Sequence, residues 1–120
     1  MRIYILDNRL DGERLLQNLD EVYGVNEESD IRLFTYTGDF LWVFKNFRPD
    51  MVFIRVGCIG LNGLMVARQL WDLDQEVKVV LVSHHRDYAI YAYDVHAADF
   101  LLEPLTPNRL RETLSLAGAR

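Results

Sequence analysis

The sequence is poor in the residues that build disulfide-linked, membrane-spanning or nucleic-acid-binding proteins. Its single cysteine, Cys58, excludes an internal disulfide. No apolar run approaches the length of a transmembrane helix or a signal peptide, so we expect a cytoplasmic protein without membrane contact. Lysine and arginine number 13 against 18 aspartates and glutamates, and the net charge of −5 argues against direct nucleic-acid binding.

The length and composition of the chain are those of one ordinary globular domain. The chain has 120 residues, of which 50% are hydrophobic and 26% are charged, a composition far from that of disordered chains. This length suffices for one layered core but not for two. We therefore predict a single domain over residues 1–120 that folds on its own.

Short apolar runs alternate with amphipathic segments along the whole chain. The spacing predicts strands at 2–7, 31–36, 51–56, 77–83 and 98–103, and helices at 13–22, 39–47, 62–73, 86–96 and 106–117. In the second helix the expected apolar face is Phe40, Val43, Phe44 and Phe47. Strict alternation with short loops predicts an α/β fold, a doubly wound five-stranded parallel sheet with helices on both faces.

In such a sheet, functional groups gather at the carboxyl ends of the strands. The residues that the pattern places there are Asp7, Asn8, Arg55, Ser83, Glu103 and Pro104. An arginine at the end of a strand built for burial is unusual, because an unpaired buried charge is costly. Arg55 therefore requires an anionic partner, and Asp7 and Glu103 are the candidates at the same sheet edge.

The stretches "PDMVFIRVGCIGLNGLMVARQL" and "DYAIYAYDVHAADFLLEPLTPNRLRETL" carry a resemblance over nearly the whole chain. It resembles the receiver domain of response regulators, and most of all the LytTR-class receivers. The resemblance implies the (βα)5 flavodoxin-like receiver fold and a cis peptide bond between Glu103 and Pro104. It also places Phe100 at the strand-five aromatic position, where core packing is an adequate explanation.

A working receiver, as the resemblance implies, uses magnesium to move a phosphoryl group onto its own aspartate. Adjacent acids hold the metal, an aspartate attacks, a Ser or Thr binds phosphoryl oxygens, and a lysine pairs with the charge. Asp7 and Ser83 match this pattern. The second acid is Asn8, the nucleophile is Arg55 and the lysine is Glu103.

These departures indicate a degenerate site, a pseudo-receiver. Arginine cannot be deprotonated in proteins and has no lone pair for attack, so no acyl phosphate can form at residue 55. We expect Arg55 to act as an internal cation that bridges to Asp7, Glu103 or both. The alternative is neutral decay, with both partners solvated at the rim of the sheet. No metal or cofactor is expected.

Other polar residues near the strand ends receive structural interpretations. His84 and His85 point apart as neighbours, and we expect a solvated loop rather than a metal site. Ser83 is interpreted as a capping hydroxyl for the helix that follows. Cys58 is interpreted as an unreactive loop thiol.

Three aromatic residues fall where a polar side chain is expected and are candidate interface residues. Trp42 lies opposite the apolar face of its helix, Tyr91 lies away from its own, and Trp71 falls at a position that is usually polar in the resembled family. We expect a protein partner or a homodimer to use the face of the fourth helix, the fifth strand and the last helix, which is the output surface of the resembled family.

These observations predict a phosphorylation-independent interaction module in bacterial signal transduction or transcription control. Two alternatives stay open from the sequence. One is a sensor domain that binds an acidic small molecule at Arg55, and the other is a receiver with residual phosphotransfer activity. Against an enzyme, the chain lacks a glycine-rich phosphate loop and a nucleophile paired with a base.

Overall fold

Strands and helices alternate in the computed structural model, which describes residues 1–24 and 29–117. The strands are β1 (Arg2–Leu6), β2 (Asp30–Phe34), β3 (Met51–Arg55), β4 (Lys78–Ser83) and β5 (Asp99–Leu102). The helices are α1 (Arg9–Tyr23), α2 (Thr37–Asn46), α3 (Gly63–Leu73) and α4 (Pro107–Ser115), and a 3₁₀ helix, η1 (Arg86–Tyr91), lies between β4 and β5. In this described part, no helix is long and apolar enough to cross a bilayer.

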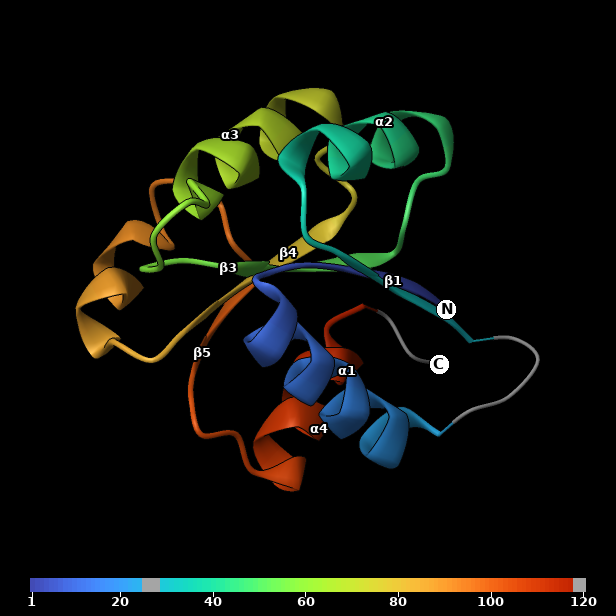
Figure 1. Cartoon of the computed structure of the whole chain (residues 1–120), viewed down its shortest axis with the longest axis vertical. Helices are drawn as coiled ribbons and strands as arrows, with labels where there is room; N and C mark the ends of the chain where they lie inside the picture. The colour runs from blue at the N-terminus through green and yellow to red at the C-terminus, as the bar shows by residue number, and fades with distance from the viewer. Residues whose placement is uncertain (25–28, 118–120) are drawn as a thin grey trace.

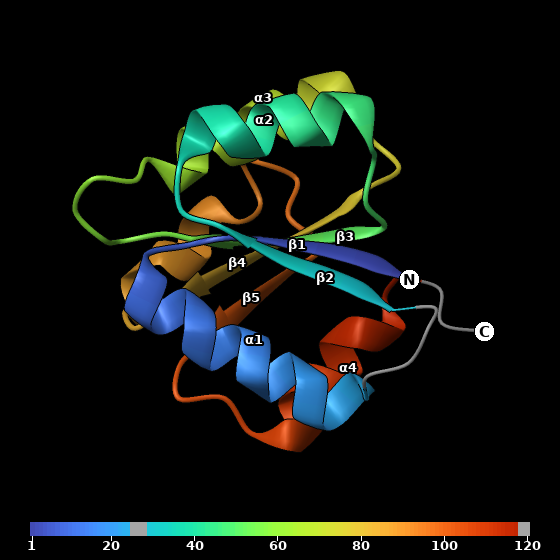
Figure 2. The same cartoon turned by 45° about the vertical axis from the view of Figure 1, so that its right-hand side comes forward.

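The five strands form one parallel sheet in the order β2-β1-β3-β4-β5. The chain leaves β1 toward one edge and returns to β3 on the other side of β1, so strand order reverses there. Helices cover both faces of the sheet: α2 and α3 lie on one, and α1 and α4 on the other (Figures 1 and 2). The predicted doubly wound fold is confirmed.

Each face of the sheet has its own apolar core, because fully buried strands point side chains to both sides. Phe40 and Phe44 of α2 and Leu70 of α3 belong to one cluster. Leu15 of α1 and Leu110 of α4 belong to the other. The strand ends that carry the polar residues are therefore held from both sides.

The last helix is anchored to the edge strand by polar contacts as well. Thr106 caps α4 by accepting the N–H of Arg109 at 3.1 Å, and Pro107 is its first residue, as the sequence predicts. The guanidinium of Arg109 donates to both carboxylate oxygens of Asp99, at 2.8 and 2.7 Å. Buried Thr113 also donates to Asp99, at 2.7 Å.

The predicted end of the second helix is wrong by one residue, with a consequence for its apolar face. Phe47 is the C-cap of α2, with φ −140° and ψ 89°, and its side chain is exposed. The extended backbone ahead of Pro49 turns Phe47 away from the face that Phe40 and Phe44 share. Its carbonyl instead accepts the hydroxyl of Tyr4, at 2.6 Å.

The predicted fourth helix over 86–96 is also wrong. The structure has only the 3₁₀ helix η1 there, followed by turns up to the start of β5. Its N-cap residue, His85, makes no side-chain capping bond, and none of the residues of η1 is buried. Without a cap or a buried face, a segment with three tyrosines, an isoleucine and two aspartates has little to hold an α-helix.

Candidate functional site

The polar residues at the carboxyl ends of the strands come together at the point where strand order reverses. Asp7 directly follows β1, and its N–H bonds the carbonyl of Phe34 in β2 at 3.1 Å. Arg55 is the last residue of β3, Ser83 is the last of β4, and Glu103 follows β5. Four neighbouring strands thus contribute one side chain each to the same edge of the sheet.

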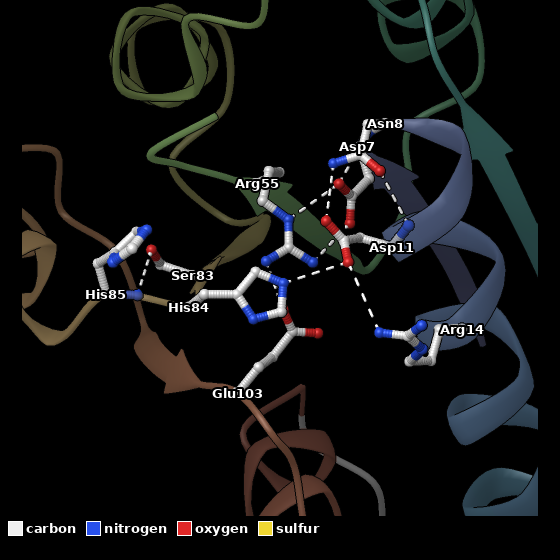
Figure 3. A network of polar contacts seen from close by, with 9 residues as sticks. All are labelled: Asp7, Asn8, Asp11, Arg14, Arg55, Ser83, His84, His85 and Glu103. Carbon is white, nitrogen blue, oxygen red and sulfur yellow. Dashed lines mark hydrogen bonds and ion pairs between the residues drawn. The ribbon is translucent and has the colours of Figure 1, made fainter. Parts of the chain in front are cut away.

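Arg55 is the largest fully buried side chain among the described residues, with 1% of its side chain exposed. Its Nε and Nη2 atoms donate to the two carboxylate oxygens of Asp7, at 2.9 and 3.0 Å. Its Nη1 atom donates to Oε1 of Glu103 (Figure 3). The predicted bridge from Arg55 is confirmed, and it reaches both acids.

Burial and pairing act in opposite directions on these charges. Burial alone lowers the pKa of Arg55, but the hydrogen bonds and charges of Asp7 and Glu103 outweigh it and raise the pKa. Burial raises the pKa of Asp7, and the bonds from Arg55 and from the N–H of Asn8 oppose that rise. Arg55 is therefore a permanent cation, and its bonds and charge favour the ionised form of Asp7 against the effect of burial.

Asn8 serves the adjacent helix. Its side-chain oxygen accepts the N–H of Asp11 at 2.9 Å and caps α1, and its amide nitrogen donates to Oδ2 of Asp11, also at 2.9 Å. This amide bond is the main reason that the pKa of Asp11 lies below its ordinary value. The amide that stands in place of a second acid is thus engaged in holding the start of α1.

Three further site residues have structural roles in the described protein. Ser83 is fully buried, and its hydroxyl accepts the N–H of His85 at 3.0 Å, just before η1. The capping role predicted for Ser83 is wrong, because the N-cap residue of η1 is His85 and Ser83 bonds only the N–H of that residue. Phe100 is partly buried against the cluster on the α2 and α3 face. The Glu103–Pro104 bond is cis, as predicted.

His84 departs from the sequence-based interpretation of a solvated loop. Its Nε2 lies 3.2 Å from Oδ1 of Asp11 and 3.4 Å from Oε1 of Glu103. Asp11 was not predicted as a site residue. The bonds of Arg55 go to Asp7 and Glu103, whereas Asp11 contacts His84. The available signal was position: Asp11 is in the first turn of the helix after Asp7, and His84 follows the last residue of β4.

Comparison with known proteins supports this architecture. Residues 3–115 match the family described as the response regulator receiver domain. The chain belongs to this family.

The relatives of this receiver domain are longer than it is. The sensory transduction protein LytT of Oceanobacillus iheyensis is 28% identical over the full chain, which covers 52% of LytT. A response regulatory protein of Yersinia pestis is 29% identical over 96% of the chain, which covers 47% of that protein. The receiver thus spans about half the length of these relatives.

Solved receiver structures have the same fold at low sequence identity. A putative response regulator from Chloroflexus aurantiacus J-10-fl superposes with a TM-score of 0.82 at 17% identity, over 99% of this chain and 98% of that one. The response regulatory domain of mrkE from Klebsiella pneumoniae gives a TM-score of 0.80 at 18% identity, over 98% and 95%. The fold is therefore that of a receiver.

The magnesium ion that the receiver family implies does not fit the residues of this site. Both oxygens of Asp7 accept bonds from Arg55, and one of them also accepts the N–H of Asn8, at 2.7 Å. The guanidinium brings a positive charge to the place where carboxylates would surround the ion. Hard divalent cations need several free oxygen ligands, and both oxygens of Asp7 are already engaged.

The three candidate interface aromatics of the receiver are placed differently. Trp42 on α2 is 62% exposed, and Tyr91 at the end of η1 is 42% exposed. Trp71 on α3 is partly buried and stacks on the ring of His96, with centroids 4.1 Å apart and an interplanar angle of 11°. Trp42 and Tyr91 are available to a partner, whereas Trp71 already has an aromatic neighbour.

Proposed function

We propose that this receiver is a phosphorylation-independent regulatory module of two-component signalling, in which a built-in ion pair replaces metal and phosphoryl chemistry. The observation that carries the proposal is the buried guanidinium of Arg55, bound to Asp7 and Glu103 at the ends of β1 and β5. A guanidinium remains charged at every physiological pH. The site therefore has a permanent internal cation.

Two considerations support this proposal. The last residue of β3 offers no oxygen that could accept a phosphoryl group, because it is an arginine. The side chain of Glu103, at the position of the family's lysine, is turned toward Arg55 and adds negative charge where a phosphoryl group would need a cation. Both changes act against phosphotransfer.

The proposal predicts inertness to small phosphodonors. After incubation with acetyl phosphate and magnesium, we expect the intact mass of the domain to be unchanged, because no aspartate stands at the end of β3. A receiver with an aspartate at that position, treated in the same tube, serves as the positive control. A stoichiometric, acid-stable and base-labile adduct on this chain would contradict the proposal.

The alternative sensor function finds less support. An acidic ligand would have to displace two carboxylates from a guanidinium that is 1% exposed. A cavity of about 620 Å³ is lined by residues 56–64 and Tyr88 and does not include Arg55. We therefore favour an interaction module over a ligand sensor.

Regulation requires a partner, and we propose that it is a second copy of this chain, bound through η1, β5 and α4. β5 is an edge strand of the sheet. Ile90, Tyr91 and Tyr93, in and just after η1, are exposed to 72%, 42% and 89%. Aromatic side chains of this kind are enriched at protein interfaces.

The relative BtsR of Salmonella typhimurium is named a transcriptional regulatory protein, which supports a role in transcription control.

This proposal predicts self-association that depends on Tyr91. We expect Tyr91→Ala to weaken the dimer about tenfold or more, because a central aromatic residue dominates such interfaces. Trp42→Ala, on α2 and outside the proposed face, should leave association unchanged. Sedimentation velocity over a concentration series measures both. A monomer at all concentrations, or equal effects of the two variants, would argue against this face.

A further inference from the structure

Asp11, His84 and Glu103 form a second cluster, which shares only Glu103 with the ion pair of Arg55. They come from the first turn of α1, the segment after β4 and the end of β5, yet one ligand atom of each lies within 4.8 Å of the other two. Figure 3 shows the ring of His84 between the two carboxylates. An imidazole nitrogen and two carboxylates, brought together from distant parts of the sequence, are a ligand set for a metal ion.

The distances within the cluster match those of a metal centre. Zinc binds nitrogen and oxygen ligands at about 2.0–2.2 Å, so two ligands of a tetrahedral ion stand about 3.4 Å apart. Nε2 of His84 lies 3.2 Å from the oxygen of Asp11 and 3.4 Å from that of Glu103. Both separations are close to the ligand–ligand distance of a tetrahedral ion, and without an ion the shorter one is a hydrogen bond between His84 and Asp11.

The charges around the cluster also favour a cation. The carboxylates of Asp7, Asp11 and Glu103 lie together, and the buried cation among them is Arg55. Arg14 approaches Asp11 only to 3.9 Å, with 60% of its side chain exposed. Arg55 and His84 both approach Oε1 of Glu103, and the second oxygen of this carboxylate, Oε2, has lone pairs of its own for an ion.

The exposure of the three residues resembles that of an open metal site. The side chains of Asp11 and Glu103 are 17% and 6% exposed, whereas that of His84 is 47% exposed. The two acids are thus held in place, and the imidazole covers them from the solvent side. An ion can enter beside His84 and keep water on its remaining positions.

We propose that Asp11, His84 and Glu103 bind a first-row transition-metal dication such as zinc. The imidazole nitrogen selects such an ion over magnesium, which prefers oxygen. This site is separate from the magnesium position of the receiver family, which Asp7, Asn8 and Arg55 occupy here, and it revises the expectation that no metal binds. A bound ion would tie the segment between β4 and η1 to α1 and β5.

The test is a calorimetric titration of the whole chain with zinc chloride. We expect one zinc per chain, and a loss of affinity of about tenfold or more in His84→Ala and in Asp11→Asn, since removal of an outer-shell partner alone costs about that much. His85→Ala is the matched control, because its exposed ring lies on the neighbouring residue and outside the cluster. Its affinity should equal that of the parent, and excess magnesium should not compete.

Two further experiments test whether zinc binds at this cluster and not elsewhere on the chain. Cys58→Ser removes the free thiol, a strong zinc ligand outside the cluster, and should leave binding intact. Zinc should raise the melting temperature of the parent but not that of His84→Ala. Circular dichroism checks that each variant is folded. Absence of binding at millimolar zinc, equal affinity of His84→Ala and the parent, or loss of binding in Cys58→Ser would overturn the proposal.

Discussion

Arg55→Ala is expected to lower the free energy of unfolding by about 3–5 kcal/mol at neutral pH, the range for removing one partner of a buried ion pair. The variant leaves the carboxylates of Asp7 and Glu103 close together, with 1% and 6% of their side chains exposed and the guanidinium gone. Urea unfolding, followed by fluorescence, measures the change. Arg32→Ala is the control, because its ion pair with Asp30 is exposed and its loss should change stability little.

Arg55→Met separates the charge from the packing of the long side chain. Methionine fills much of the same volume without a cation, so it should remain almost as destabilising as alanine. If Arg55→Met is instead as stable as the parent, the guanidinium contributes only by its volume. An internal cation would then be the wrong description of Arg55.

The loss of unfolding free energy caused by Arg55→Ala should become smaller on acidification. Burial already raises the pKa of Asp7, and Arg55 opposes that rise. Without Arg55 the folded-state pKa rises further, so the folded variant keeps a proton that the unfolded chain has lost. Its stability relative to the parent therefore falls as the pH rises through that pKa and recovers below it. Unfolding curves at a series of pH values test this sign.

Gly63→Ala is expected to cost about 3 kcal/mol, at the upper end of the range for overpacking. A Cβ atom at this position would lie 2.1 Å from the backbone carbonyl oxygen of Arg55 and 2.9 Å from a methyl group of Ile54. A backbone atom of a central strand cannot move aside cheaply, so the first turn of α3 must shift. Urea unfolding measures the loss.

Gly38→Ala is the matched control for Gly63→Ala. Gly38 also lies in the first turn of a helix, α2, but an added Cβ atom there would meet no heavy atom within 4 Å. Alanine favours the helix, so Gly38→Ala should raise stability by up to about 1 kcal/mol. Equal stability of the two variants would mean that α3 does not need its close approach to β3.

The strands were predictable because their sequences have one physical explanation. Runs such as residues 51–55 and 78–83 are too short and too apolar for surface helices, and burial on both faces explains them. The strand ends, and with them Asp7, Arg55 and Glu103, followed from the same alternation. The pairing of Arg55 could be predicted because a buried guanidinium without a partner is too costly.

The segment 86–96 shows where such reasoning fails. Its apolar residues are spaced as in a helix, but tertiary structure uses only a few of them: Val95 is buried, whereas Ile90 and Tyr93 are exposed. Periodicity reports which residues could share a face, not whether the fold supplies a surface for that face. His96, with φ 59°, further breaks any helical continuation.

The contacts of His84 could not be predicted from the sequence, for a different reason. Its two acidic neighbours are 73 and 19 residues away along the chain, and whether a loop side chain points toward or away from them depends on the path of the backbone. The bond from the N–H of His85 to Ser83 sets part of this path. Strand order brings the elements together, but it does not orient a side chain in the loop.

The bridge of Arg55 also restricts the routes by which this domain could evolve. A change of Arg55 to aspartate alone would set three acids against one another at the ends of β1, β3 and β5. A change of Glu103 to lysine alone would set two cations side by side. Each single step toward a phosphate-accepting site therefore passes through a less stable protein. Restoring the family's charges therefore requires changes at Arg55 and Glu103 together, and the second acid would still be missing at Asn8.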